Sequence, residues 1–287
     1  MIGRSYWERP ARIRPAVEQD VPAIATLANS RQLPYQPLTT EAAVLSAMNG
    51  RSHTDEWWWE RLGQVDTFVA EDRRGQVVGA CSYAVDLKDN TGYLLWFATV
   101  DRYSVVKSLT LHALTALGAC PVVRAYWFAT PLSLGLEGLP AGLLPETDNA
   151  LRDCGLTGCD LWLWMATDNL PAECSAVADV RDTPTGWRLE VDSGGDRPDG
   201  EAEIGCYGDL GVLWWISVDE GARRRGLGRR LLTQALATLA KYGARSVMLF
   251  VDHDDPAKRD RRPAIALYKS MGFQVIDHLF SYESTIR

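Results

Sequence analysis

Glycines and arginines gather in one short segment, residues 223–228, whose sequence is RRRGLG. Two glycines two positions apart let the backbone approach a ligand closely, because neither carries a Cβ atom. The segment lies between an apolar run, residues 212–218, and an amphipathic run, residues 231–240, which predict a strand and a helix. The start of such a helix presents unpaired N–H groups and the positive end of its dipole. Residues of these types in this order indicate a cradle for a pyrophosphate.

The flanking residues carry this interpretation, because a run of arginines alone is more often a solvated face. Gly243 is a typical helix end, and residues 246–251 (SVMLFV) predict a buried strand after it. One face of the predicted helix is continuously apolar and consists of Leu231, Leu232, Ala235, Leu236, Leu239 and Ala240. The order is therefore strand, glycine-rich turn, helix, strand.

A second signature follows in residues 262–273 (RPAIALYKSMGF). Pro263 suits the first turn of a helix and Gly272 suits its end. Ala264, Leu267, Tyr268 and Met271 form one stripe of that helix. By itself, Tyr268 in this stripe is typical of a core tyrosine with its hydroxyl at the surface.

Together these segments resemble the GCN5-related N-acetyltransferase (GNAT) superfamily. The acyl-CoA motif of that family is Q/R-x-x-G-x-G/A between a strand and a helix, and Arg223, Gly226 and Gly228 match it. Its later motif is N-x-x-A-x-x-L-Y-x-x-x-G-F, and the asparagine of that motif falls on Arg261 here. The remaining positions of the later motif are matched by Ala264, Leu267, Tyr268, Gly272 and Phe273. The resemblance covers residues 187–287.

The resemblance implies transfer of an acyl group, most simply acetyl from acetyl-CoA, to a primary amine, without a metal. Tyr268 would protonate the departing thiolate as the catalytic acid. Main-chain groups of the strand would pair with the pantetheine arm, and the turn would hold the pyrophosphate. The implied cofactor-binding residues are Ile216, Ser217, Val218, Arg223, Arg224, Arg225, Gly226, Leu227, Gly228 and Arg229.

The N-terminal half repeats part of this pattern. Residues 95–101 (LWFATVD) echo residues 213–219 (LWWISVD), and residues 109–117 echo residues 231–239. Leu109 follows Asp101 by 8 positions whereas Leu231 follows Asp219 by 12, so the first copy is four residues short at the cradle. Its linking residues contain no glycine, and the β-branched Val105 and Val106 stand there instead.

We therefore expect an α/β protein, of α+β type with mixed sheets, built as two tandem GNAT-like domains. Residues 1–170 would form a degenerate copy, and residues 171–287 an acyl-CoA-binding copy that lacks the first helices of the family. In the first copy the pattern predicts a strand and helix over 12–28, strands over 67–71 and 76–86, and an end over 149–165. Residues 167–186 predict the joint, and residues 187–191 and 201–207 a hairpin.

Composition excludes several classes of function. The net charge of −7 and the pI near 5.2 disfavour nucleic acid as a general partner and suit a cationic small molecule. No apolar run approaches the ~20 residues of a membrane span, and residues 1–12 lack an apolar signal core, so we expect a cytoplasmic protein. The 6 cysteines would then be reduced thiols. Metal sites at Cys154 and Cys159, or at residues 252–255 (DHDD), are the less favoured interpretations.

Several points stay open in the sequence. The general base could be Glu201, Glu203 or Asp209, each of which is more often an ordinary surface carboxylate. The tryptophans of residues 57–59 predict either an aromatic acceptor pocket or, preferably, packing between the two copies. The acceptor is a small-molecule amine, and the protein is a monomer or a homodimer. Alternatives to the enzyme are a non-catalytic acyl-CoA-binding module and an aminoacyl-tRNA-dependent transferase with the same fold.

Overall fold

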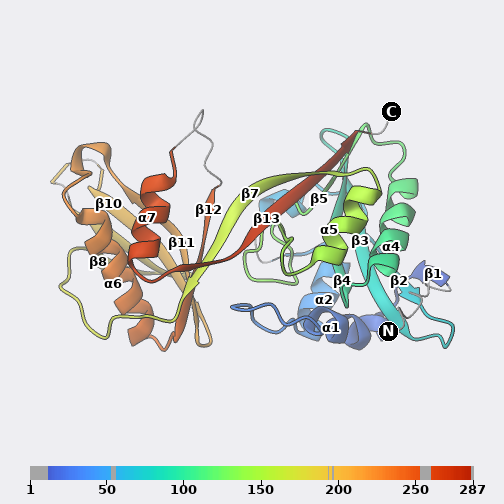
Figure 1. The fold of residues 1–287 in the computed structure, drawn as a ribbon, viewed down its shortest axis with the longest axis horizontal. Coiled ribbons are helices and arrows are strands. Elements are labelled where there is room, and N and C mark those ends of the chain that lie inside the picture. The colour runs from blue at the N-terminus through green and yellow to red at the C-terminus, as the bar shows by residue number, and fades with distance from the viewer. Residues whose placement is uncertain (1–11, 53–55, 193, 196, 253–259, 286–287) are drawn as a thin grey trace, which may run out of the picture. The chain divides into compact units, whose positions relative to one another are not determined.

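The computed structural model describes residues 12–52, 56–192, 194–195, 197–252 and 260–285. The chain divides into two compact units (Figure 1). The first consists of Met1–Leu161 together with His278–Arg287, and the second consists of Trp162–Asp277. Each unit contains an antiparallel meander that leads into a parallel strand–helix–strand segment, which confirms the mixed α/β fold and the internal repeat.

The first unit is a sheet covered by helices on both faces. Its strands follow the order β1-β2-β3-β4-β5-β13, and only β4 and β5 are parallel. The strands are β1 (Arg12–Pro15), β2 (Asp66–Glu71), β3 (Val77–Asp86), β4 (Thr91–Thr99), β5 (Val122–Ala125) and β13 (Gln274–Thr285), with the short β6 (Leu139–Pro140) beside β13. The helices are η1 (Glu18–Asp20), α1 (Val21–Asn29), α2 (Glu41–Met48), α3 (Glu56–Trp59), α4 (Tyr103–Ala116) and α5 (Pro145–Asp153).

Alternation along β4 explains why this unit has buried side chains on both faces of its sheet. Successive residues of a strand point to opposite faces. Leu95 therefore joins the core beneath α1, α2 and α3, and Leu94 joins the core beneath α4 and α5. Strands that are buried on both faces carry few polar residues, which is why β3 and β4 read as nearly continuous apolar runs.

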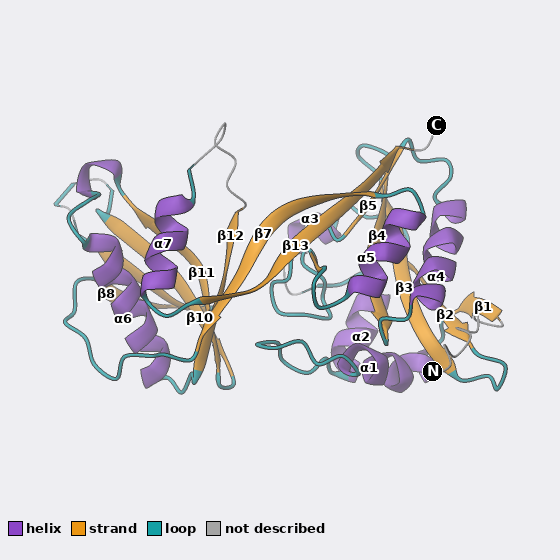
Figure 2. Ribbon diagram, in the orientation of Figure 1, coloured by secondary structure: helices purple, strands orange, loops and turns teal. Residues whose placement is uncertain are grey.

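The second unit has helices that share a single core. Its strands follow the order β7-β12-β11-β10-β9-β8, and only β11 and β12 are parallel. The strands are β7 (Thr157–Thr167), β8 (Asp179–Thr183), β9 (Gly186–Val191), β10 (Gly200–Tyr207), β11 (Leu210–Val218) and β12 (Ser246–Asp252). The helices η2 (Glu220–Ala222), α6 (Leu227–Lys241) and α7 (Arg262–Ser270) follow β11 and β12. Helices α6 and α7 lie side by side (Figure 2) and bury Leu231, Leu236 and Tyr268 together.

Two features of the strands differ from the sequence-based expectation. Residues 149–165 were expected to end the first copy, but β7 continues into the second unit, where Thr167 pairs with Val247 and Leu163 with Val251. The end of β13 instead completes the first unit, where Tyr282 pairs with Ala125. Residues 167–186 were expected to be a joint, yet they contain β8, which pairs with β9. No helix in the described part of the chain is both long and apolar enough to cross a membrane.

Candidate active site

The glycine-rich turn forms an unobstructed helix start. Strand β11 ends at Val218, and the Asp219 side chain accepts from the Gly221 N–H at 2.9 Å. Gly226 then adopts a left-handed conformation (φ +75°) as the N-cap of α6. The first helical bond runs from the Arg230 N–H to the Gly226 carbonyl at 3.2 Å. The four preceding N–H groups, from Gly226 to Arg229, therefore have no acceptor within the helix, and Gly226 has no side chain to cap them.

The space above both glycines is open. A Cβ atom at Gly226 would meet no atom of the described residues within 4 Å. A Cβ atom at Gly228 would lie 3.6 Å from Val218 Cγ2 and 3.7 Å from Leu267 Cδ2, which are ordinary contacts. Packing of the protein therefore does not require glycine at position 228, and backbone conformation alone requires it at position 226.

The predicted arginines divide into two groups. Arg223, Arg224 and Arg225 are exposed, and Arg223 Nε donates to the Val218 carbonyl at 3.0 Å. The Arg229 guanidinium instead contacts α7, at 2.5 Å from Ser270 Oγ and 3.1 Å from Met271 Sδ. The Arg229 side chain therefore ties α6 to α7, and only its main-chain N–H belongs to the helix start.

Strand β11 has an open edge beside this turn. Its pairing with β12 covers only the stretch from Leu210 to Leu213. Beyond that stretch β11 pairs only with β10 among the described residues, where Ser217 lies opposite Glu201. The Asp219 N–H donates to the Asp199 carbonyl at 2.8 Å.

The register of β10 and β11 then determines which residues of β11 direct their main-chain N–H and C=O groups to the open edge. Main-chain groups alternate between the partner strand and the opposite side. Asp219 bonds to Asp199, the residue just before β10. Val218 and Ile216 therefore direct their N–H and C=O groups to the open edge, and Ser217 directs its groups to β10. The geometry thus favours two of the three predicted strand residues as main-chain partners of a ligand and gives Ser217 a different role.

Tyr268 lies in the core of the second unit. It is 7% exposed and packs edge-to-face on Phe273, with ring centroids 5.8 Å apart. Burial raises the pKa of its phenol, and the positive charge of Arg261 opposes part of that rise. Tyr268 is therefore a protonated phenol at neutral pH, which is the form that a general acid requires.

The three candidate bases differ in their distance from the open edge of β11. Glu201 and Glu203 both contact Arg188, at 2.6 and 3.2 Å, and Arg188 also contacts Glu190 at 2.9 Å. Glu201 in addition accepts from Ser217 Oγ at 3.3 Å. Asp209 precedes β11 at its other end, so a rise of about 3.3 Å per residue places it roughly 20 Å from Ile216. That separation removes Asp209 from the candidates, whereas Glu201 and Glu203 remain.

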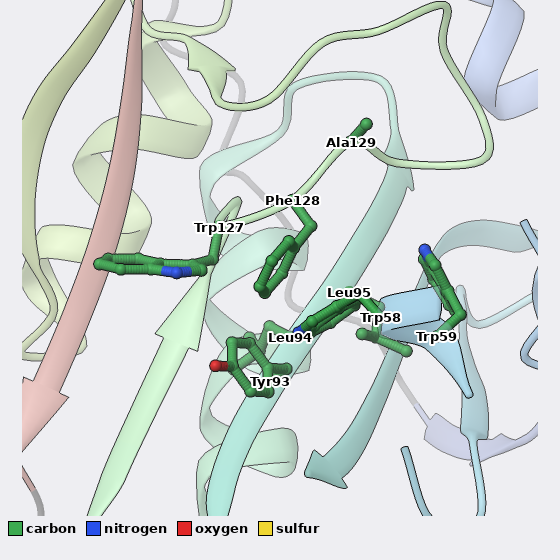
Figure 3. A pocket seen from close by; sticks show the side chains of 8 residues that line it. All are labelled: Trp58, Trp59, Tyr93, Leu94, Leu95, Trp127, Phe128 and Ala129. Carbon is green, nitrogen blue, oxygen red and sulfur yellow. The ribbon is translucent and has the colours of Figure 1, made fainter. Parts of the chain in front are cut away.

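The consecutive tryptophans belong to the first unit. Trp57 is 64% exposed, while Trp58 and Trp59 are buried in the core under α1 and α2. Trp58 stacks on Phe128, with ring centroids 3.5 Å apart, and meets Tyr93 edge-on (Figure 3). The cavity between these rings measures about 10 Å³, which is room for a single water molecule. The structure thus replaces the prediction of packing between copies for Trp58 and Trp59 with packing inside one copy.

The corresponding turn of the first unit has a different structure. Asp101 follows β4 with φ +52°, and its carboxylate accepts from the Thr147 N–H and hydroxyl, each at 2.8 Å. It therefore caps α5, and Arg31 contacts it from outside at 3.2 Å. Val105 and Val106 in the first turn of α4 are fully buried. This turn contains no glycine, and its two valines fill the position of the cradle, as the missing residues predicted.

The described residues provide no support for the two less favoured metal sites. His253, Asp254 and Asp255 lie outside the described residues. All 6 cysteines are free thiols, and Cys154 Sγ contacts the Lys107 carbonyl at 3.8 Å. Among the residues with described positions, no group of three or more histidine, cysteine or acidic side chains is arranged around a common point.

Known proteins with similar sequences are acetyltransferases. Residues 184–275 match the family described as acetyltransferase (GNAT) domain. The chain is 32% identical over 114 residues to the mycothiol acetyltransferase of Nocardioides sp., a match that covers 40% of this chain and 36% of that protein. It is 28% identical over 283 residues to the mycothiol acetyltransferase of Rothia mucilaginosa, covering 84% of this chain and 75% of that one. The first match thus spans only about a third of the length of the relative.

A solved structure shares the fold along nearly the whole chain. It is a tandem GNAT protein from the clavulanic acid biosynthesis pathway, with a TM-score of 0.66 and 14% identity, and the match covers 96% of this chain and 98% of that one. At this identity the likeness concerns the fold alone. The cradle motif, the helix that carries Tyr268, the family match over residues 184–275 and the repeated fold agree with one another. Residues 184–275 of this chain therefore match the acetyltransferase (GNAT) domain family, and the fold of the whole chain is similar to that of a tandem GNAT protein.

Proposed function

We propose that this protein is an N-acyltransferase that moves the acetyl group of acetyl-CoA to the amino group of a small molecule. The observation that carries the proposal is the open edge of β11, which runs directly into the uncapped start of α6. Residues 171–287 would form the acyl-CoA-binding domain, and residues 1–170 the degenerate copy. Unsatisfied main-chain donors in this arrangement suit an extended amide-bearing chain that ends in a diphosphate.

Binding would use the two parts of the site in order. The N–H groups from Gly226 to Arg229 would receive the diphosphate, with Arg224 and Arg225 adding charge. The pantetheine arm would lie along β11 as an extra strand. Because Arg223 Nε already occupies the Val218 carbonyl, the arm would pair with the Val218 N–H. The Ile216 N–H would then lie at the thioester carbonyl and polarise it.

The chemistry needs an attacking amine, an oxyanion donor and an acid. The neutral amine attacks the thioester carbon, and the Ile216 N–H stabilises the negative charge that develops on oxygen. The C–S bond then breaks, the sulfur takes the proton of the Tyr268 hydroxyl, and the nitrogen of the new amide releases its second proton to water. Alignment of amine and thioester supplies much of the acceleration, since positioning can contribute about 7–11 kcal/mol.

A carboxylate acting through water would take the proton that the alkylammonium must lose before attack. Glu201 and Glu203 are the described carboxylates on the strand next to Ile216 and Ser217. Their shared contact with Arg188 holds both in place. Replacing each glutamate by glutamine distinguishes the two candidates. Only the substitution of the true base should change the acidic limb of the pH–rate profile.

The acceptor is best sought among small cationic amines. Relatives named mycothiol acetyltransferase support a small-molecule acceptor. The net charge of −7 attracts an ammonium group and repels nucleic acid. No residue of the proposed mechanism needs a metal.

The test combines binding with turnover. The purified chain should bind acetyl-CoA saturably and should release free thiol from it when a suitable member of an amine panel is added. Cys159 and Cys174 are exposed and react with thiol reagents themselves, so a reaction without amine must be subtracted. Binding without turnover for every amine would indicate a non-catalytic module. Stabilisation by tRNA and not by CoA would indicate the aminoacyl-tRNA-dependent alternative.

A further inference from the structure

Arg261 occupies a position of particular interest in α7. It is the N-cap of that helix and stands where the family motif has asparagine. Tyr268 follows it by seven residues, which is two helical turns, so both lie on one face of α7. Long side chains of a helix lean toward its N-terminus. The Tyr268 ring therefore leans toward the end of the helix that bears Arg261.

An ion pair with Asp252 fixes the guanidinium of Arg261. Asp252 is the last residue of β12, and the two side chains are 19% and 38% exposed. At this point β12 pairs only with β7 in the described part of the chain, because its pairing with β11 has ended at Leu249. The pair therefore holds a half-buried positive charge on the side of β12 where it has separated from β11.

The charges around Tyr268 are few. Arg261 of α7 is the charged group that acts on the phenol, and Asp252 of β12 faces Arg261. Arg229 of α6 points elsewhere, to Ser270 at the far end of α7. No charge from β7, β11 or α6 acts on Tyr268 among the described residues.

We propose that Arg261 is a positioning residue that acts through Tyr268, with Asp252 setting where its charge lies. When the C–S bond breaks, the sulfur gains an electron pair and takes the phenolic proton, which leaves a phenolate. The Arg261 guanidinium stabilises that phenolate, and a proton from solvent restores the phenol. This role rests on the proposed function. In it, the charge of Arg261 acts at the position where the family motif has asparagine.

The experiment titrates Tyr268 directly in the full chain without ligand. Tyrosine labelled with ¹³C at Cζ gives one NMR signal per ring, and the Tyr268→Phe variant assigns the signal of Tyr268 among the 10 tyrosines. Arg261→Gln should raise the pKa of Tyr268 further, because burial then acts unopposed. Asp252→Asn should lower it, because the guanidinium loses its counter-charge. Arg262→Gln is the matched control: it removes the neighbouring charge, which is 76% exposed and paired with Asp260, and should leave the signal unchanged.

Kinetics supply the second measurement once an accepting amine is known. Arg261→Gln should lower kcat about tenfold with little change in KM, which is less than the ~10²–10⁴-fold expected for loss of a general acid. Arg261→Lys should retain most of the rate. Equal Tyr268 titrations in Arg261→Gln and Arg262→Gln would overturn the proposal, as would shifts of the same sign in Arg261→Gln and Asp252→Asn. A protein that shows the opposite shifts but has no acyltransferase activity would instead refute the proposed function.

Discussion

Gly226 allows the cradle to be tested without confusing binding with folding. Alanine at this position would keep every contact among the described residues, because its Cβ meets none of their atoms within 4 Å, but it would be strained at φ +75°. An L-residue in the left-handed region costs about 1–2 kcal/mol. Gly243 lies at the other end of the same helix with φ +100° and is equally unobstructed. Gly243→Ala is therefore a control with the same type of strain and no ligand nearby.

The two variants should lose similar stability and differ in binding. Each should lower Tm by a few degrees, which follows from ~1–2 kcal/mol in a chain of this size. Gly226→Ala should in addition displace the N–H groups that receive the diphosphate or obstruct its approach. Loss of one hydrogen bond to a charged group costs about 1.5–3 kcal/mol, which is roughly a 10- to 150-fold rise in Kd.

Isothermal titration with acetyl-CoA measures this difference directly, and urea unfolding measures the stability of both variants. Gly243→Ala should bind acetyl-CoA like the unmodified chain. Equal Kd values for the two variants would refute the cradle, since strain alone would then account for everything observed. A loss of affinity in Gly243→Ala would show that helix stability, and not main-chain access, controls binding.

Three further predictions concern single side chains. Tyr268→Phe should lower kcat by about 10²–10⁴-fold with an unchanged Kd for acetyl-CoA, and an undiminished rate would remove Tyr268 from the mechanism. Burial lowers the pKa of His112, which packs on Phe68, so the unfolded chain takes up this proton first as the pH falls. Stability should therefore fall below about pH 6.5, with a slope that is smaller in His112→Phe; equal slopes in urea unfolding would contradict this. Asp101→Asn should cost about 1–3 kcal/mol in urea unfolding without changing acetyl-CoA binding, because it weakens the cap of α5 and the ion pair with Arg31, both in the first unit; unchanged stability would show that Thr147 finds another acceptor.

Much of the second unit was predictable because its signals are local. The periodicity of residues 231–240, the glycines that flank them and Pro263 each specify a helix or its end within a few residues. The degenerate turn of the first unit was equally accessible, since the missing residues and the pair Val105 and Val106 are visible in the repeat. These features depend on backbone conformation and the identity of nearby side chains.

The missed features depend on partners distant in sequence. An apolar run shows that β7 is buried but not that its end pairs with β12. Asp179–Thr183 is polar and mostly exposed, so its pairing with β9 leaves little trace in the sequence. The location of Trp58 depends on Phe128, which lies 70 positions away. Only the register between β10 and β11 shows which main-chain groups face the open edge. These are the groups of Ile216 and Val218, and not those of Ser217.

The shared use of β13 has a consequence for how the chain matures. The strand that borders Val122–Ala125 contains residues 282–285, which are synthesised after the whole second unit. During translation one side of strand β5 of the first sheet therefore stays unpaired until more than a hundred further residues have been synthesised. A continuous fragment that ends at Leu161 would lack this strand of the first unit, so a circular permutant is the rational way to isolate that unit.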